Sequence, residues 1–144
     1  MNTIDRPIGW TTIDEAKRLV CASVAANTAD MWYHKGEQNP KPYREHRDFV
    51  DSPCWSLGAL FHLLPKEILP VNGSKSFLFA TEGIDHPWTL VYVDLDDHDV
   101  PGLAFQKDTL VEACIEMIVA LKVAEQEGKV LVLRPQDDEE GGQQ

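Results

Sequence analysis

The sequence predicts an α+β protein in which an antiparallel sheet of three to four strands carries its helices on one face. Two observations lead to this prediction. Helix-capping boxes precede two amphipathic segments, and between them lie apolar stretches of strand length separated by loops rich in Gly, Pro and Asp. Neighbouring strands joined by such loops pair antiparallel. The expected order of elements is therefore α-α-β-β-β-α.

A chain of 144 residues is long enough to bury one core without disulfides. We expect a single globular domain over residues 1–135. Within it, residues 1–53 form an N-terminal helix and a long loop, and residues 54–135 form an α-β-β-β-α core. The acidic, glycine-containing segment 136–144 is expected to be disordered.

The first helix is predicted to begin at Thr12, because Thr12 and Glu15 can cap it reciprocally, and to end near Asn27. From residue 34 to 53, prolines and a glycine interrupt any periodic pattern, which predicts a long polar connection. Aromatic and arginine side chains in and beside this connection have the composition of an interaction surface. The residues of this predicted surface are Trp32, Tyr33, Tyr43, Arg44 and Arg47. The alternative is that the rings hold the loop against the body of the protein.

The core region restarts with a short helix capped by Ser56 and closed by Pro65. Strands are predicted at 76–81, 88–95 and 103–105, with 130–133 as a candidate fourth strand and 67–71 as a short extended piece. The strand at 88–95 carries Leu90, Tyr92 and Asp94 on one side and Thr89, Val91, Val93 and Leu95 on the other. We expect the second side to face the core. The last helix, 109–127, begins with the capping box of Thr109 and Glu112.

The chain carries a net charge of −11, with 24 acidic and 13 basic residues. Such a chain repels a phosphate backbone, so direct binding of DNA or RNA is disfavoured. An acidic surface favours solubility, and it also suits a basic protein partner. Because no apolar run is long enough to span a bilayer and the N-terminus lacks a secretory pattern, we expect a cytoplasmic protein without membrane contact. The three cysteines form no Cys-x-x-Cys pair, and we expect Cys21 and Cys114 to be small buried hydrophobes.

An acidic cluster follows the central strand and is the first candidate for a metal site, since closely spaced carboxylates bind hard cations such as Ca²⁺. Its members are Asp94, Asp96, Asp97, His98 and Asp99. If Asp94 is the first ligand of an EF-hand loop, Asp99 falls where a glycine is required and Phe105 falls where a glutamate is required. The mismatch favours a solvated turn. The sequence therefore assigns no metal ligand.

Motifs that would identify catalytic or cofactor-binding residues are absent. The five histidines show no recognised metal-ligand spacing, and nucleophile-elbow, phosphate-loop and dinucleotide patterns are missing. Catalytic groups need to be adjacent only in space, so an enzyme with a dispersed site stays as an alternative. The leading interpretation is a non-enzymatic protein without a cofactor.

The order helix, strand, strand, strand, helix after Ser56 resembles that of a double-stranded-RNA-binding domain. That family contacts RNA through lysines near the start of its second helix, and the matching stretch 107–112 holds one lysine and two acids. This resemblance implies the topology without the RNA-binding residues. Residues 92–95, 101–106 and 108–113 are similar to the core of HicB-type antitoxins, in which a sheet and helix cap a small basic toxin.

Residues 27–31, 53–60 and 108–118 resemble stretches of uncharacterised proteins from bacterial phages and integrated mobile elements. This resemblance implies a mobile-element origin and no particular activity. The leading prediction is a small cytoplasmic module that binds another, unknown protein, with a homo-oligomer left open. The alternatives are a HicB-like antitoxin that neutralises a basic toxin and an enzyme with a dispersed site.

Overall fold

The computed structural model describes residues 9–34, 39–42, 52–71, 73–84 and 87–133. Its helices are α1 (Ile13–Cys21), the short 3-10 helix η1 (Ala26–Thr28), α2 (Leu57–Leu63) and α3 (Leu110–Gln126). Its strands are β1 (Met31–Tyr33), β2 (Lys41–Pro42), β3 (Ser52–Cys54), β4 (Glu67–Pro70), β5 (Ser76–Thr81), β6 (Trp88–Asp94), β7 (Asp99–Lys107) and β8 (Val130–Leu133). The predicted α+β class is confirmed. The tail predicted to be disordered, 136–144, lies outside the described residues.

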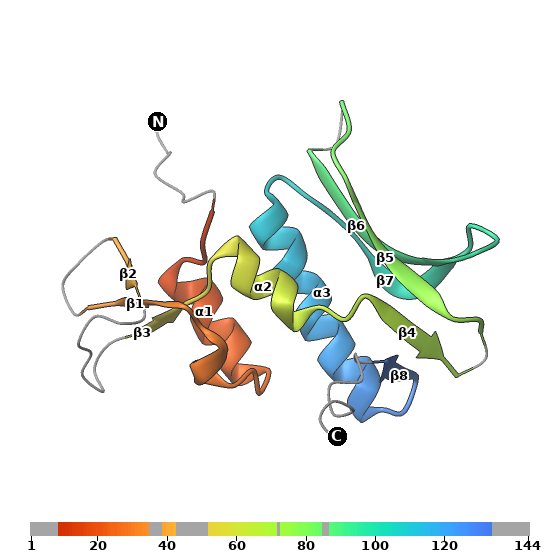
Figure 1. Cartoon of the computed structure of the whole chain (residues 1–144), viewed down its shortest axis with the longest axis horizontal. Helices are drawn as coiled ribbons and strands as arrows, with labels where there is room; N and C mark the ends of the chain where they lie inside the picture. The colour runs from red at the N-terminus through yellow and green to blue at the C-terminus, as the bar shows by residue number, and fades with distance from the viewer. Residues whose placement is uncertain (1–8, 35–38, 43–51, 72, 85–86, 134–144) are drawn as a thin grey trace, which may run out of the picture.

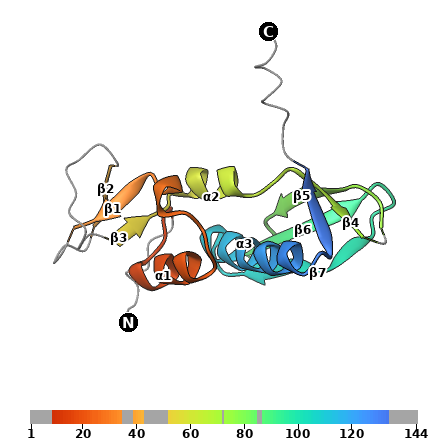
Figure 2. The same cartoon turned by 90° about the horizontal axis from the view of Figure 1, so that it is seen from below.

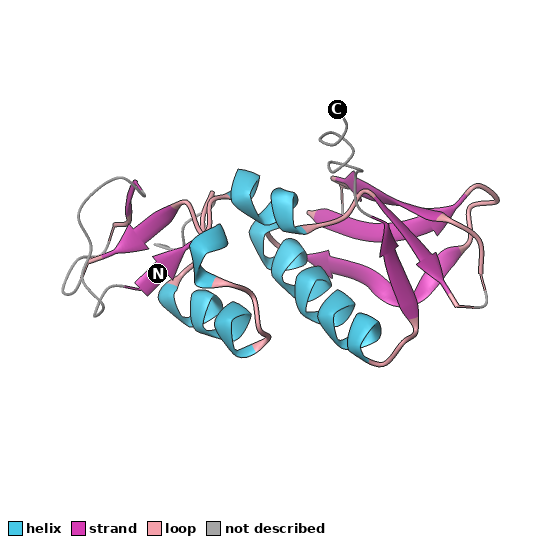
Figure 3. Ribbon diagram, turned by 60° about the horizontal axis from the view of Figure 1, so that its bottom comes forward, coloured by secondary structure: helices cyan, strands magenta, loops and turns pink. Residues whose placement is uncertain are grey.

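The main sheet has five strands in the order β7-β6-β5-β4-β8, and every neighbouring pair is antiparallel. Figure 1 shows α2 and α3 on one side of this sheet, which curls around α3. A small sheet, β2-β1-β3, lies with α1 at the opposite end of the molecule (Figures 1 and 3). The helices therefore cover one face of the main sheet, and no described element forms a layer over the other face.

The main sheet has more strands than the sequence predicts, because β4 joins it between β5 and β8. Ile68 of β4 pairs with Ser76 on one side and with Val132 on the other. Strand β7 is also longer than the predicted 103–105. It passes through Pro101 and Gly102 at the place where the register against β6 shifts, and an edge strand tolerates such an irregularity.

The N-terminal region differs from the sequence prediction in two places. Helix α1 ends at Cys21 and not near Asn27, because Ser23 adopts a left-handed backbone with φ of 73°. The described parts of the predicted long connection contribute β2 and the first residues of β3, which pair with β1 on either side. Short strands that contain proline show little periodicity in their sequence, so the apolar pattern does not predict β2 and β3.

Helix α3 is the element on which the rest of the core packs. Its capping box forms as predicted, with the Thr109 side chain accepting from the Glu112 backbone N–H at 3.1 Å. It contacts β6, β7 and β8 on one side and α1 and α2 on the other, an arrangement visible from below in Figure 2. Its fully buried side chains are Val111, Ala113, Cys114 and Met117, with Ile115, Ile118 and Leu121 nearly so. The helix ends before Gly128, whose φ of 73° suits glycine.

The prediction for the faces of β6 is wrong. Leu90 and Tyr92 are fully buried against α3, whereas Val91 and Val93 lie on the opposite face and Leu95 is 85% exposed. Tyr92 can occupy the core because its hydroxyl donates to the Pro65 carbonyl at 2.6 Å. Burial raises the pKa of this phenol well above its ordinary value.

A buried hydrogen-bond cluster joins the N-terminal segment to β1 and β3. The fully buried Thr11 donates its backbone N–H to the Trp55 carbonyl at 3.0 Å, and its hydroxyl accepts from the Trp55 N–H at 3.1 Å. The hydroxyl of Tyr33 donates to the Thr11 carbonyl at 2.7 Å. The cluster satisfies polar groups that would otherwise be buried without partners, so it fixes how the N-terminal half meets α2.

A second link connects α1 to α3. The two terminal guanidinium nitrogens of Arg18, Nη1 and Nη2, donate to the Glu116 carboxylate at 2.5 and 2.9 Å. Hydrogen bonds from Arg18, reinforced by its charge, lower the pKa of Glu116 below its ordinary value. A carboxyl whose pKa is lower in the folded state stabilises the fold above its unfolded pKa, and it loses this contribution as the pH falls through the folded pKa.

We therefore predict that Glu116→Gln lowers stability near neutral pH and makes thermal unfolding less dependent on acid pH. Because Arg18 is about half exposed, the loss at neutral pH should be at most about 1 kcal/mol. Melting temperatures measured from pH 7 to 3 should converge for the two proteins at the acid end. Glu125→Gln, on an exposed part of the same helix, is the control. A difference that stays constant with pH would contradict the assignment.

We also predict that Leu121→Asp unfolds the domain or destabilises it by at least about 3 kcal/mol, because it removes a buried side chain and places a charge in the core. Val123→Asp is the matched control, since Val123 lies two residues further along α3 and is 46% exposed. Chemical denaturation followed by circular dichroism measures both. Equal stability of the two variants would refute the assigned face of α3.

Candidate functional site

The helix-free face of the main sheet is apolar. Opposite residues in an antiparallel pair share a face, and the pairs on this one are Phe77–Val93, Phe79–Val91 and Leu69–Leu131. None of these side chains belongs to the core under α3. Phe79 is 52% exposed, Leu131 60% and Leu69 38%, and the other three are partly exposed. We call these six residues the outer apolar face.

Such a face departs from the usual pattern of an antiparallel sheet, in which the solvated side is polar. On this one the Glu67–Lys75 ion pair interrupts the apolar residues, because Glu67 lies in register between Phe77 and Leu133, and two threonines lie at one end. Glu67 is next to Phe77 and forms an ion pair with Lys75 at 3.6 Å, while Thr81 and Thr89 pair at the far end of β5 and β6. The valines of β6 led the sequence prediction to place this face in the core. Its composition is that of a buried surface, although nothing in the described chain covers it.

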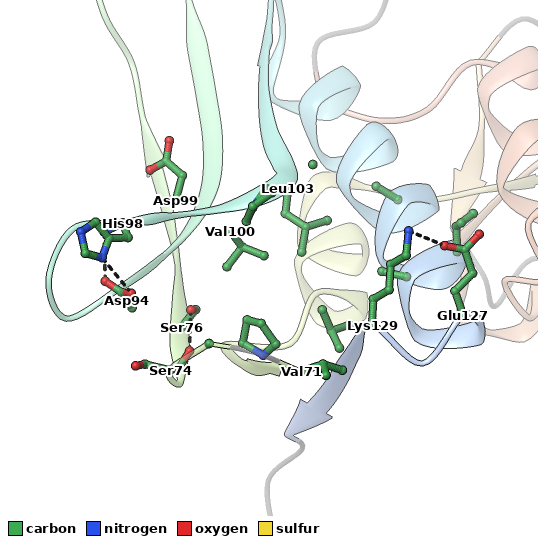
Figure 4. A pocket seen from close by; sticks show the side chains of 18 of the residues that line it. Val71, Ser74, Ser76, Asp94, His98, Asp99, Val100, Leu103, Glu127 and Lys129 are labelled. Carbon is green, nitrogen blue, oxygen red and sulfur yellow. Dashed lines mark hydrogen bonds and ion pairs between the residues drawn. The ribbon is translucent and has the colours of Figure 1, made fainter.

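A cleft of about 870 Å³ opens on the other face, between the C-terminal half of α3 and the curled sheet (Figure 4). Its floor is apolar and includes Val100 and Leu103 from β7, with Ala120 and Val123 from α3. Val71 closes the bottom, where its backbone N–H donates to the Lys129 carbonyl at 2.9 Å. The sequence does not indicate this cleft, because its walls come from four separate segments.

One rim of the cleft is the acidic turn between β6 and β7. The Oδ1 atom of Asp94 accepts from the backbone N–H groups of Asp96 and His98, both at 2.9 Å. These hydrogen bonds lower the pKa of Asp94 below its ordinary value, with a smaller contribution from the His98 charge. Asp97 completes the turn with a left-handed φ of 65°. The turn expected from the sequence is confirmed, and one carboxylate organises it.

Three side chains of this turn could approach one cation. The possible ligand atoms of Asp94, Asp96 and His98 lie within 4.8 Å of one another. Among the described residues, no other group of three His, Cys, Asp or Glu side chains lies close enough to share a metal ion. Asp96 and His98 are exposed, and one Asp94 oxygen is already held by two backbone donors. A hard cation would need further oxygen ligands that the apolar floor does not supply.

The same turn contains a carboxylate and an imidazole, the pairing that an acid–base mechanism uses. His98 Nδ1 lies 3.5 Å from Asp94 Oδ2, but its side chain is 77% exposed. The nearest hydroxyl in the sheet register, that of Ser76, donates to the Ser74 carbonyl at 2.9 Å and not to a base. The arrangement therefore positions a charge at the cleft without activating a nucleophile.

The structure places the predicted interaction residues in two groups. Trp32 and Tyr33 are buried, with 8% and 5% of their surface exposed, and Tyr33 is fixed by its bond to Thr11. These two rings pack β1 against the body of the protein, which agrees with the alternative that the aromatic side chains have a packing role. Tyr43, Arg44 and Arg47 lie outside the described residues.

Comparisons with models of protein families, with curated proteins and with solved structures find no match for this chain. The described chain also contains no helix long and apolar enough to cross a bilayer. The site must therefore be assigned from the geometry of the chain itself.

The cysteines give a test of the packing of the core and of the cluster around Thr11. Cys54 and Cys114 are fully buried, and burial raises the pKa of their thiols to about 11 and about 12, respectively. Cys21 is exposed, so the prediction that it is a buried residue is wrong. We predict that a thiol reagent such as DTNB modifies one cysteine in the native protein and three after denaturation, because the thiolate is the reactive form. Cys21→Ser should abolish the native reaction. Rapid modification of that variant would contradict the assigned burial.

Proposed function

We propose that this chain is a non-enzymatic, cytoplasmic protein-binding module and that its contact surface is the outer apolar face. The observation that supports the proposal is an apolar sheet surface over which none of the described residues forms a layer. Contiguous exposed apolar patches are rare on monomeric proteins and mark interaction sites. Phe79 is a half-exposed aromatic residue on this face, and aromatic side chains are among those that contribute most to binding.

The partner that this surface suits has an apolar contact patch surrounded by basic groups. The chain carries a net charge of −11, and exposed Asp96, Asp97 and Asp99 stand at the end of β6 and β7. Charges at a rim steer association and exclude partners of like sign, while the apolar centre contributes affinity. A second copy of this strongly acidic chain would suffer charge repulsion, so a basic partner of different sequence is favoured. The resemblance to phage and mobile-element proteins favours a partner encoded by the same element.

The experiment is capture of partners by the tagged full chain from cells that encode it, followed by mass spectrometry and a binding measurement with the purified partner. Phe79→Lys should weaken binding about tenfold or more, because an aromatic contact is lost and a charge is placed in the apolar contact. Val20→Lys is the matched control, since Val20 is 45% exposed on α1, away from the face. Circular dichroism confirms that both variants fold.

Two outcomes would contradict the proposal. Recovery of no protein above background would count against a binding module, and unchanged affinity of Phe79→Lys would remove the outer apolar face as the contact surface. Sedimentation of the purified chain separates self-association from binding to another protein, because a dimer that Phe79→Lys dissociates would make a second copy the occupant.

A further inference from the structure

The cleft beside α3 is a separate feature on the opposite side of the sheet from the outer apolar face. Its volume of about 870 Å³ lies within the range of roughly 300–1,000 Å³ that is typical of small-molecule sites. Such sites combine apolar walls with a few fixed polar groups. The floor residues Val100 and Leu103 are nearly buried, while Val123 forms an accessible wall at 46% exposure.

Asp94 is the fixed polar group of this cleft. It pairs with the buried Ser76 in the sheet register, which directs it to the same concave side as Tyr92. The two backbone N–H groups that bind Oδ1 hold the carboxylate in place. The structure gives the other oxygen, Oδ2, one partner among the described residues, the exposed His98 imidazole at 3.5 Å. A desolvated cation could therefore replace His98 at Oδ2 without disturbing the turn.

The opposite rim does not offset this charge. Figure 4 shows Glu127 and Lys129 across the cleft from the Asp94 turn, and the Lys129 ammonium group is paired with the Glu127 carboxylate at 3.0 Å. The two charges of that rim cancel, so the carboxylates of Asp94 and Asp99 on the facing turn set the sign at the entrance. The net charge of the whole chain, −11, adds to the attraction for a cation and to the repulsion of an anion.

We propose that this cleft binds a small organic cation, a protonated amine carried on an apolar body, with the amine at Asp94 and the body along α3. The described carboxylates that line the cleft are those of Asp94, Asp99 and Glu127, and the last is paired with Lys129, so they fall short of the six to eight oxygen ligands that Ca²⁺ takes. The apolar part of the lining supplies a surface for aliphatic carbon. A charge-assisted hydrogen bond from the ammonium group to a pre-oriented carboxylate gives the head its specificity. Burial of the alkyl part contributes roughly 0.8 kcal/mol for each methylene group removed from water.

The test is titration of the full chain with octylamine by calorimetry, with octanoate and octanol as probes of equal chain length. Octylamine should bind saturably and at least about tenfold more tightly than octanoate, and its affinity should fall with added salt. Asp94→Asn is the first variant, because the amide oxygen still accepts the two backbone hydrogen bonds while the charge is removed. It should weaken octylamine binding about tenfold and leave octanol binding unchanged.

Val123→Trp is the second variant, since it fills the cleft from an exposed helix position and should abolish binding of octylamine. Val20→Trp adds the same side chain at a position of nearly equal exposure on α1 and should bind as the natural chain does. Three results would overturn the proposal. These are absent or non-saturable octylamine binding, equal affinity for octylamine and octanoate, and octylamine affinity that Val123→Trp leaves unchanged.

Discussion

The structure depends on one helix covering a sheet of five strands. Four spacings of about 4.8 Å make such a sheet roughly 19 Å wide, whereas a helix with its side chains is about 10 Å across. Helix α2 packs on α3 and does not extend the cover over the sheet. The curl of the sheet brings β8 and β7 to α3 from two sides and reduces the uncovered area without removing it. The cleft beside α3 follows from this shortage of helix, whereas the outer apolar face is bare because no described helix lies on its side of the sheet.

The two uncovered surfaces differ in the chemistry that they present. The outer apolar face is broad and is built from three pairs of apolar side chains, with the Glu67–Lys75 ion pair beside Phe77. Its area and composition suit a macromolecule, because a small ligand would leave most of it in water. The cleft is concave and has at its entrance the Asp94 carboxylate, held by two backbone N–H groups, which suits a small molecule. The buried cluster around Thr11 and the Arg18–Glu116 link keep the N-terminal half attached to α3, at the other end of the molecule.

The sequence predicts those parts of the fold that local chemistry determines. Both capping boxes, the end of α3 at Gly128 and the turn after β6 depend on neighbouring residues, and the structure confirms them. Strand β4 and the small sheet depend on pairing with distant segments, which leaves no local signal. The face of β6 was predicted wrongly because both of its sides are apolar, and only the hydrogen bond from Tyr92 to Pro65 distinguishes the side that is buried. The presence of apolar residues on both sides of β6 is the one feature of the sequence that indicates the outer apolar face. The cleft gives no such signal, since its walls come together only in the folded chain.

We propose that the outer apolar face is exposed in the free protein and covered in its working complex. Hydroxyl-radical footprinting of the purified chain, alone and with its captured partner, measures this residue by residue. In the free chain Phe79 and Leu131 should be oxidised much faster than Leu90 and Tyr92, which are fully buried. In the complex, protection should appear at Phe79 and Leu131. Slow oxidation of these residues in the free chain, or a complex in which they stay as reactive as before, would contradict the account.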